Sequence, residues 1–131
     1  MRDLYVNLPV KDVQRSRDFF SALGFEINEQ FSNDDAVAVV FSEGAYAMLL
    51  GEDFFRRFID GEIADPSGGT QVLNALSAGS REDVDQLLER ALAAGATEHH
   101  QREPVEMEEM YSRAFKDPDG HVWEILHMDM G

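Results

Sequence analysis

Cysteine is absent from this chain of 131 residues, and it has few basic residues and no long apolar stretch. The lack of cysteine excludes disulfides, thiolate nucleophiles and cysteine-ligated metal centres. No apolar run exceeds six residues, which is too short for a membrane-spanning helix. The first residues, Met1 to Leu4, also lack the apolar core of a signal peptide, so we expect a cytoplasmic location.

The charge balance is strongly acidic, with 11 basic and 26 acidic residues and a net charge of −15 at pH 7. Such a surface repels phosphate backbones and anionic lipids, so we expect neither a nucleic-acid partner nor a membrane partner. The same field would attract a cationic ligand, although acidic surfaces also serve solubility, which is the simpler explanation. The sequence contains no Gly-x-Ser-x-Gly elbow, phosphate loop or dinucleotide fingerprint, which argues against hydrolase, kinase and dehydrogenase functions.

The first half of the sequence begins with a strand and a helix and continues with three strands. Asp12 can cap a helix whose apolar residues follow helical spacing up to Leu23, and Gly24 stands where a left-handed C-cap belongs. Strands are predicted at residues 4–10, 25–31, 36–41 and 45–50. A short amphipathic helix containing Phe54 and Phe58 should follow, and the glycines and proline of residues 61–69 indicate a linker.

The second half repeats this order. Ser80 and Asp83 form a capping-box start for a helix, and Gly95 repeats the role of Gly24. Strands are predicted at residues 70–78, 96–102, 110–116 and 121–128, with Asp117-Pro118-Asp119-Gly120 as the last hairpin turn. We therefore predict two copies of one βαβββ module.

These patterns predict an α+β fold. A four-stranded sheet with one helix leaves one face uncovered, so two modules should pair their sheets into an incomplete barrel around a cup. Module 1 covers about residues 1–60, the linker about 61–69 and module 2 about 70–131, within a single domain of residues 1–131. A ferredoxin-like sandwich would need a helix between the third and fourth strands of each half, and the short turns leave no room for one.

Two stretches resemble a known family. The opening contains Asn7-Leu8-Pro9-Val10-Lys11-Asp12, then Arg15-Ser16-Arg17-Asp18-Phe19-Phe20 and Leu23-Gly24-Phe25; the closing run is Phe115-Lys116-Asp117-Pro118-Asp119-Gly120-His121-Val122-Trp123-Glu124-Ile125. Together they resemble the glyoxalase, bleomycin-resistance and extradiol-dioxygenase family, the vicinal oxygen chelate superfamily. The resemblance implies a glyoxalase-like fold over nearly the whole chain.

The family's metal-dependent members take two ligands from each module, one on its first strand and one on its fourth. Matching the two halves of the chain places Tyr5, Met48, Leu73 and Glu124 at these positions. A hard divalent cation needs several oxygen or imidazole ligands, and one carboxylate beside a thioether and an alkyl group does not provide them. We therefore expect no tightly bound metal and no other cofactor.

Glu124 is the most informative of these residues, because it stands among apolar residues on its strand face. It is either a general base or polar anchor for a ligand, or a structural carboxylate held by Tyr5. Tyr5 can donate a hydrogen bond or form an aromatic wall, and Met48 and Leu73 suit an apolar lining. Tyr111 and Arg113 should face one side of their strand as a contact for an anion, although an arginine there is more often paired with a surface carboxylate.

We expect the histidines to have surface or packing roles. His99 and His100 are adjacent and point to opposite faces of a strand, while His121 and His127 share a face but lie about 20 Å apart.

Three hypotheses for function follow. The first is a metal-free member of the family that binds a small organic ligand, with Glu124 as anchor or general base. The second is a non-enzymatic sequestering protein, similar to the bleomycin-resistance branch, for a cationic ligand. The third is a metal-dependent lyase, isomerase or dioxygenase. The family habit also leads us to expect a homodimer.

Overall fold

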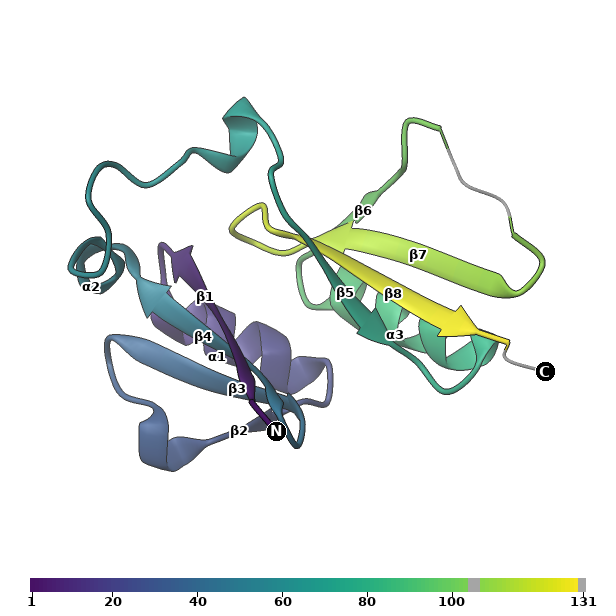
Figure 1. Ribbon diagram of the computed structural model, residues 1–131, viewed down its shortest axis with the longest axis horizontal. Helices are drawn as coiled ribbons and strands as arrows, with labels where there is room; N and C mark the ends of the chain where they lie inside the picture. The colour runs from purple at the N-terminus through teal and green to yellow at the C-terminus, as the bar shows by residue number, and fades with distance from the viewer. Residues whose placement is uncertain (104–106, 130–131) are drawn as a thin grey trace. The chain divides into compact units, whose positions relative to one another are not determined.

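The computed structural model describes residues 1–103 and 107–129. The chain forms two compact units, Met1–Ala64 and Asp65–Gly131. The division falls inside the stretch that we expected to be a linker. Each unit is an open four-stranded sheet with a helix on one face (Figure 1). No helix in the described residues is both long and apolar enough to cross a membrane.

In the sheet of the first unit, one pair of neighbouring strands is parallel and two pairs are antiparallel. Its elements are β1 (Leu4–Val10), α1 (Val13–Ala22), β2 (Glu26–Ile27), the 3₁₀ turn η1 (Glu29–Phe31), β3 (Ala36–Ser42), β4 (Ala45–Gly51) and α2 (Glu52–Arg56). The strand order is β1-β4-β3-β2, with β1 parallel to β4. Asp12 caps α1 by accepting a hydrogen bond from the backbone N–H of Arg15, as predicted, and Gly24 has a positive φ of 97°.

The core of the first unit lies between α1 and its sheet. Phe19 and Phe20 of α1 are buried, and so are the alternate residues Val37 and Val39 of β3. Ala47 and Leu49 of β4 are buried too. Because side chains alternate across a strand, the residues between these positions lie on the face that α1 does not cover.

The second unit repeats this path. Its elements are the 3₁₀ turn η2 (Pro66–Gly68), β5 (Leu73–Ser77), α3 (Arg81–Ala93), β6 (Thr97–His99), β7 (Met110–Lys116) and β8 (Val122–Met128). The strand order is β5-β8-β7-β6, with β5 parallel to β8. Ser80 caps α3 by accepting a hydrogen bond from the backbone N–H of Asp83, and the Asp83 carboxylate accepts one from Gly79.

The hairpin turn between β7 and β8 is organised around a buried carboxylate. Asp117 accepts hydrogen bonds from the backbone N–H groups of Asp119 and His121 and from the indole N–H of Trp123. Burial raises the pKa of Asp117, although the nearby His121 and these hydrogen bonds act in the opposite direction. The carboxylate thereby fixes the turn to the largest side chain of the core.

Three predicted strands are shorter in the structure by several residues, and β8 begins one residue later than predicted. Residues 25–31 form only the two-residue strand β2 and then the turn η1, because the Asn28 side chain accepts from the backbone N–H of Gln30 and starts a 3₁₀ turn. The strands predicted at residues 70–78 and 96–102 pair only over Leu73–Ser77 and Thr97–His99. β7 begins and ends where we predicted.

Candidate functional site

Tyr5 and Met48 share the uncovered sheet face of the first unit. Tyr5 on β1 pairs with Tyr46 on β4, and their rings stack with centroids 4.9 Å apart. Two residues further along, Asn7 pairs with Met48. Tyr5 is 55% exposed, so its ring is open to a ligand rather than enclosed by this unit.

These residues line a hollow of about 450 Å³. We call it the tyrosine hollow, and it is lined by Tyr5, Asn7, Asn28, Phe31, Ala38, Tyr46 and Met48. None of the seven side chains is charged. Aromatic and aliphatic groups with a few amides are the usual lining of a small-molecule site. The sequence analysis singled out Tyr5 and Met48 of this lining but not the two asparagines, whose place in the hollow depends on strand pairing.

Leu73 and Glu124 share the uncovered sheet face of the second unit. Ala75 on β5 pairs with Glu124 on β8, so Leu73 stands two residues before the partner of Glu124. Tyr5 has the same relation to Met48 in the first unit. The correspondence that we drew between the two halves of the sequence therefore matches the pairing register in both units.

A histidine shares the row of Glu124. Ala114 on β7 pairs with Glu124 on one side and with His99 on β6 on the other. The row across the sheet is thus Ala75, Glu124, Ala114 and His99, with an alanine on each side of the carboxylate. We had expected His99 to have a surface or packing role. Alternation along the strand predicted that His99 and His100 point to opposite faces. The alignment of His99 with Glu124 depends on strand pairing.

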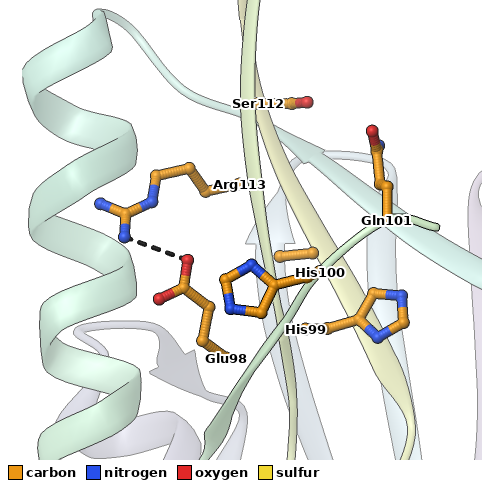
Figure 2. A pocket seen from close by; sticks show the side chains of 7 residues that line it. Glu98, His99, His100, Gln101, Ser112 and Arg113 are labelled. Carbon is orange, nitrogen blue, oxygen red and sulfur yellow. Dashed lines mark hydrogen bonds and ion pairs between the residues drawn. The ribbon is translucent and has the colours of Figure 1, made fainter. Parts of the chain in front are cut away.

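Tyr111 and Arg113, which we expected as a contact for an anion, face α3. The Tyr111 hydroxyl donates to the Asp85 carboxylate of α3 at 2.6 Å. Arg113 donates to Asp85 at 3.0 Å and to Glu98 of β6 at 3.1 Å, and Figure 2 shows the contact with Glu98. The arginine is therefore paired with carboxylates, the alternative that we had left open.

This network shifts the pKa of its members. The hydrogen bond from Tyr111, followed by that from Arg113, lowers the pKa of Asp85. The same hydrogen bond to Asp85 raises the pKa of the Tyr111 hydroxyl, and burial adds to the effect. Arg113 also lines a smaller hollow of about 170 Å³ beside His99 and His100, where the sticks in Figure 2 show the Arg113 and Glu98 side chains directed toward each other. Because the guanidinium of Arg113 already has two carboxylate partners, it is less available to bind an anionic ligand.

The residues that we matched to the family's metal positions are chemically mixed. In the first unit they are a phenol and a thioether, and in the second an alkyl group and one carboxylate. Hard divalent cations favour several carboxylate or carbonyl oxygens, and zinc or iron favours imidazole or thiolate. Within residues 1–103 and 107–129, no group of three histidine, aspartate or glutamate side chains could hold a metal ion.

Solved structures with the same fold come from several bacteria. A hypothetical protein from S. aureus is 27% identical, with a TM-score of 0.80, and the match covers 97% of this chain and 94% of that one. A glyoxalase/bleomycin resistance protein/dioxygenase family enzyme from Burkholderia phytofirmans is 21% identical, with a TM-score of 0.75, over 95% and 96% of the two chains. The fosfomycin resistance protein FosX from Listeria monocytogenes, complexed with Mn(II) and sulfate, is 21% identical, with a TM-score of 0.70, over 97% and 90%. No curated protein matches the sequence.

The predicted fold class, an α+β fold with two βαβββ modules, agrees with these neighbours and is confirmed. A family model matches residues 4–125, which is nearly the entire chain. The chain belongs to the glyoxalase/bleomycin resistance protein/dioxygenase superfamily.

Proposed function

We propose that the protein binds a small organic molecule in the tyrosine hollow without a tightly held metal ion. The observation that carries this proposal is the hollow itself. Its volume of about 450 Å³ falls in the range of small-molecule sites, roughly 300–1,000 Å³. The exposed ring of Tyr5 offers a flat surface, and Met48 places a polarisable thioether next to it.

On the uncovered sheet face of the second unit, the proposal gives Glu124 the role of polar anchor or general base, and any chemistry there is proton transfer. A base must be able to reach the proton that it removes. Glu124 is half-buried on an uncovered face, and its neighbours on both adjacent strands are alanines, so no large side chain stands directly beside it across the sheet. Within the described part of the chain, its carboxylate has no hydrogen-bonding partner. Leu73 would provide apolar lining on the same face.

The absence of a bound metal is tested by titration. Nickel, zinc, iron and manganese are added in turn to the purified protein, and the bound metal is counted after equilibrium dialysis. We expect much less than one ion per chain. One tightly held ion that disappears in Glu124→Ala but persists in Glu89→Ala, a change at an exposed glutamate of α3, would reject the metal-free proposal and favour the metal-dependent hypothesis.

A second candidate function is sequestration of a cationic molecule, which the net charge of −15 favours. Long-range attraction of this kind is screened by salt. Calorimetry with bleomycin-like glycopeptides at low and high salt tests it, and binding that is absent or unaffected by salt rejects it. Assembly as a homodimer belongs to this proposal too, and sedimentation equilibrium measures it directly.

A further inference from the structure

The two asparagines of the tyrosine hollow stand at opposite ends of one row across the sheet. Asn7 pairs with Met48, and Met48 pairs with Ala38. The backbone N–H of Asn28 donates to the carbonyl of Ala38 at 2.9 Å, which continues the row beyond β3. Three strand spacings therefore separate Asn7 from Asn28, about 14 Å of backbone distance.

Each amide is oriented by a backbone group. The Asn7 Nδ2 atom donates to the carbonyl oxygen of Tyr5 at 3.2 Å, and a carbonyl oxygen can only accept. The Asn28 Oδ1 atom accepts from the backbone N–H of Gln30 at 3.1 Å, and an N–H can only donate. Asn7 therefore keeps its Oδ1 as an acceptor, and Asn28 keeps its Nδ2 as a donor. Within the described residues, neither of these two atoms has another hydrogen-bond partner.

Between the two amides the hollow is apolar and flat-walled. Met48 and Ala38 form the middle of the row. The stacked rings of Tyr5 and Tyr46 stand on the neighbouring row, and Phe31 belongs to the same lining. Aromatic walls of this kind favour a flat ring in offset or edge contact. Two hydrogen bonds of about 3 Å each and the lengths of the two side chains take up part of the backbone distance between Asn7 and Asn28. The remaining distance fits one aromatic ring.

From this arrangement we infer the class of ligand, an inference that rests on the proposed function. The hollow takes an uncharged molecule with one aromatic ring, a hydrogen-bond donor at one end for Asn7 and an acceptor at the opposite end for Asn28. The lining selects against charged ligands, because an ion in this hollow would lose water without gaining an opposite charge. The net charge of the whole chain would instead favour a cation, so the two predictions can be separated.

The test uses 4-hydroxybenzamide, which carries a hydroxyl donor and a carbonyl acceptor at opposite ends of one ring. Its binding to the full chain is followed by NMR through the side-chain amide signals of Asn7 and Asn28. Tyramine and 4-hydroxybenzoate are the cationic and anionic controls of similar size. We expect shifts at both asparagines with 4-hydroxybenzamide, and at least ten-fold weaker binding of both ions.

The hydrogen bond between the ligand and Asn7 is tested by removing its donor and its acceptor in turn. 4-Methoxybenzamide lacks the hydroxyl donor, and Asn7→Leu lacks the acceptor at similar side-chain volume. One neutral hydrogen bond corresponds to about a 2- to 12-fold change in affinity. We expect Asn7→Leu to weaken 4-hydroxybenzamide by such a factor and to leave 4-methoxybenzamide unchanged. Asn7 is exposed, so the variant should keep the amide spectrum of the folded chain; Asn7→Ala repeats the measurement with a smaller side chain that also lacks an acceptor.

The results distinguish a wrong ligand class from a wrong proposed function. Equal or tighter binding of tyramine or 4-hydroxybenzoate at the same asparagine signals overturns the inferred ligand class and leaves small-molecule binding in the hollow intact. Equal weakening of both benzamides by Asn7→Leu overturns the assigned acceptor. If none of the four probes at millimolar concentration shifts any signal of the tyrosine hollow, both the ligand class and the proposed function fail.

Discussion

The two units of this chain share a backbone path but differ in the chemistry of their uncovered sheet faces. In both, the first strand runs parallel to the fourth, and the candidate residue on the first strand stands two positions before the partner of the candidate on the fourth. The first unit has an uncharged, aromatic face around Tyr5 and Tyr46. The second has Glu124 and His99 in one row, with alanines beside the carboxylate. The register is common to both units, whereas the side chains on the uncovered faces differ.

The covered faces differ as well. Between α1 and its sheet the buried residues are almost all apolar. In the second unit, the covered face carries Tyr111 and Arg113, which bind Asp85 of α3. The position that is Ala47 in the first unit is Trp123 in the second, where the indole binds the turn carboxylate of Asp117. The second unit therefore depends more on specific polar contacts, and the following predictions test that difference.

The largest effect is expected for Trp123→Ala. Trp123 is 2% exposed, and its removal leaves a cavity and leaves one oxygen of Asp117 without its indole donor. Truncation of a buried tryptophan costs about 3–5 kcal/mol. Denaturant unfolding followed by circular dichroism should show this loss. Amide exchange should accelerate more in β7 and β8 than in β3 and β4 if the damage stays within the second unit.

A milder variant separates packing from hydrogen bonding. Trp123→Phe keeps an aromatic ring in the core and removes the indole N–H. We expect a smaller loss than for alanine, with about 1–3 kcal/mol of it arising from the Oδ2 atom of Asp117, which loses its indole donor. Equal losses for the two variants would show that the contact with Asp117 dominates and that ring packing contributes little.

Alanine substitutions at the equivalent turn glycines of the two units should have an intermediate effect on stability. Gly44 and Gly120 have φ values of 95° and 88°, where an L side chain is strained by about 1–2 kcal/mol. A Cβ on Gly120 would also lie 3.0 Å from the Cβ of Pro66, whereas one on Gly44 meets only the Asp3 carboxylate at 3.5 Å. Gly120→Ala should therefore destabilise the chain by about 1 kcal/mol more than Gly44→Ala. Equal unfolding free energies for the two variants would contradict the close packing of Pro66 on this turn.

The order of the elements was predictable from the sequence because its signals are local. Asp12 and Ser80 cap their helices, and Gly24 and Gly95 end them with positive φ, all through contacts within a few residues. The strand at residues 25–31 was predicted too long because the side chain of Asn28 competes for the backbone and starts a 3₁₀ turn. Propensity alone does not reveal such a competition.

The site was only partly predictable because it depends on pairing between distant strands. The internal repeat located Tyr5 and Met48, and the structure places both in one hollow. Alternation put Tyr111 and Arg113 on one side of β7, but which side faces α3 depends on Asp85, 26 and 28 residues away in sequence. His99 joins the row of Glu124 through two strand pairings that no sequence pattern encodes.

Alanine substitutions at the two helix N-caps, Asp12 and Ser80, should differ less in unfolding free energy than those at the two turn glycines. Loss of a Ser or Asp N-cap costs about 0.5–2 kcal/mol, and Ser80→Ala should show this cost. Asp12 caps α1 but also lines a hollow in which four other carboxylates, those of Asp34, Asp35, Glu52 and Asp53, outnumber the two cations Lys11 and Arg56, so that its own carboxylate adds to a net repulsion. Asp12→Ala relieves that repulsion, so its net loss in unfolding free energy should be smaller. In 1 M NaCl, where charges are screened within about 3 Å, the two losses should converge; a gap that persists would exclude repulsion as its cause.

The smallest expected effect is confined to one titration in the second unit. Asp85 has a pKa below its ordinary value of 3.8, mainly because Tyr111 donates to it. Its contribution to stability is therefore present above that ordinary value and is lost as the pH falls through the folded-state pKa. Tyr111→Phe removes the donor, so the Asp85 carboxyl signal in a ¹³C NMR titration should move to a higher midpoint, and less stability should be lost on acidification. Tyr46→Phe is a control in the first unit, where the tyrosine hydroxyl accepts a 3.4 Å contact from the backbone N–H of Gly44, and it should leave that midpoint unchanged. An unmoved midpoint in Tyr111→Phe would mean that Arg113 alone holds the charge of Asp85, and that the polar network of the second unit needs no tyrosine.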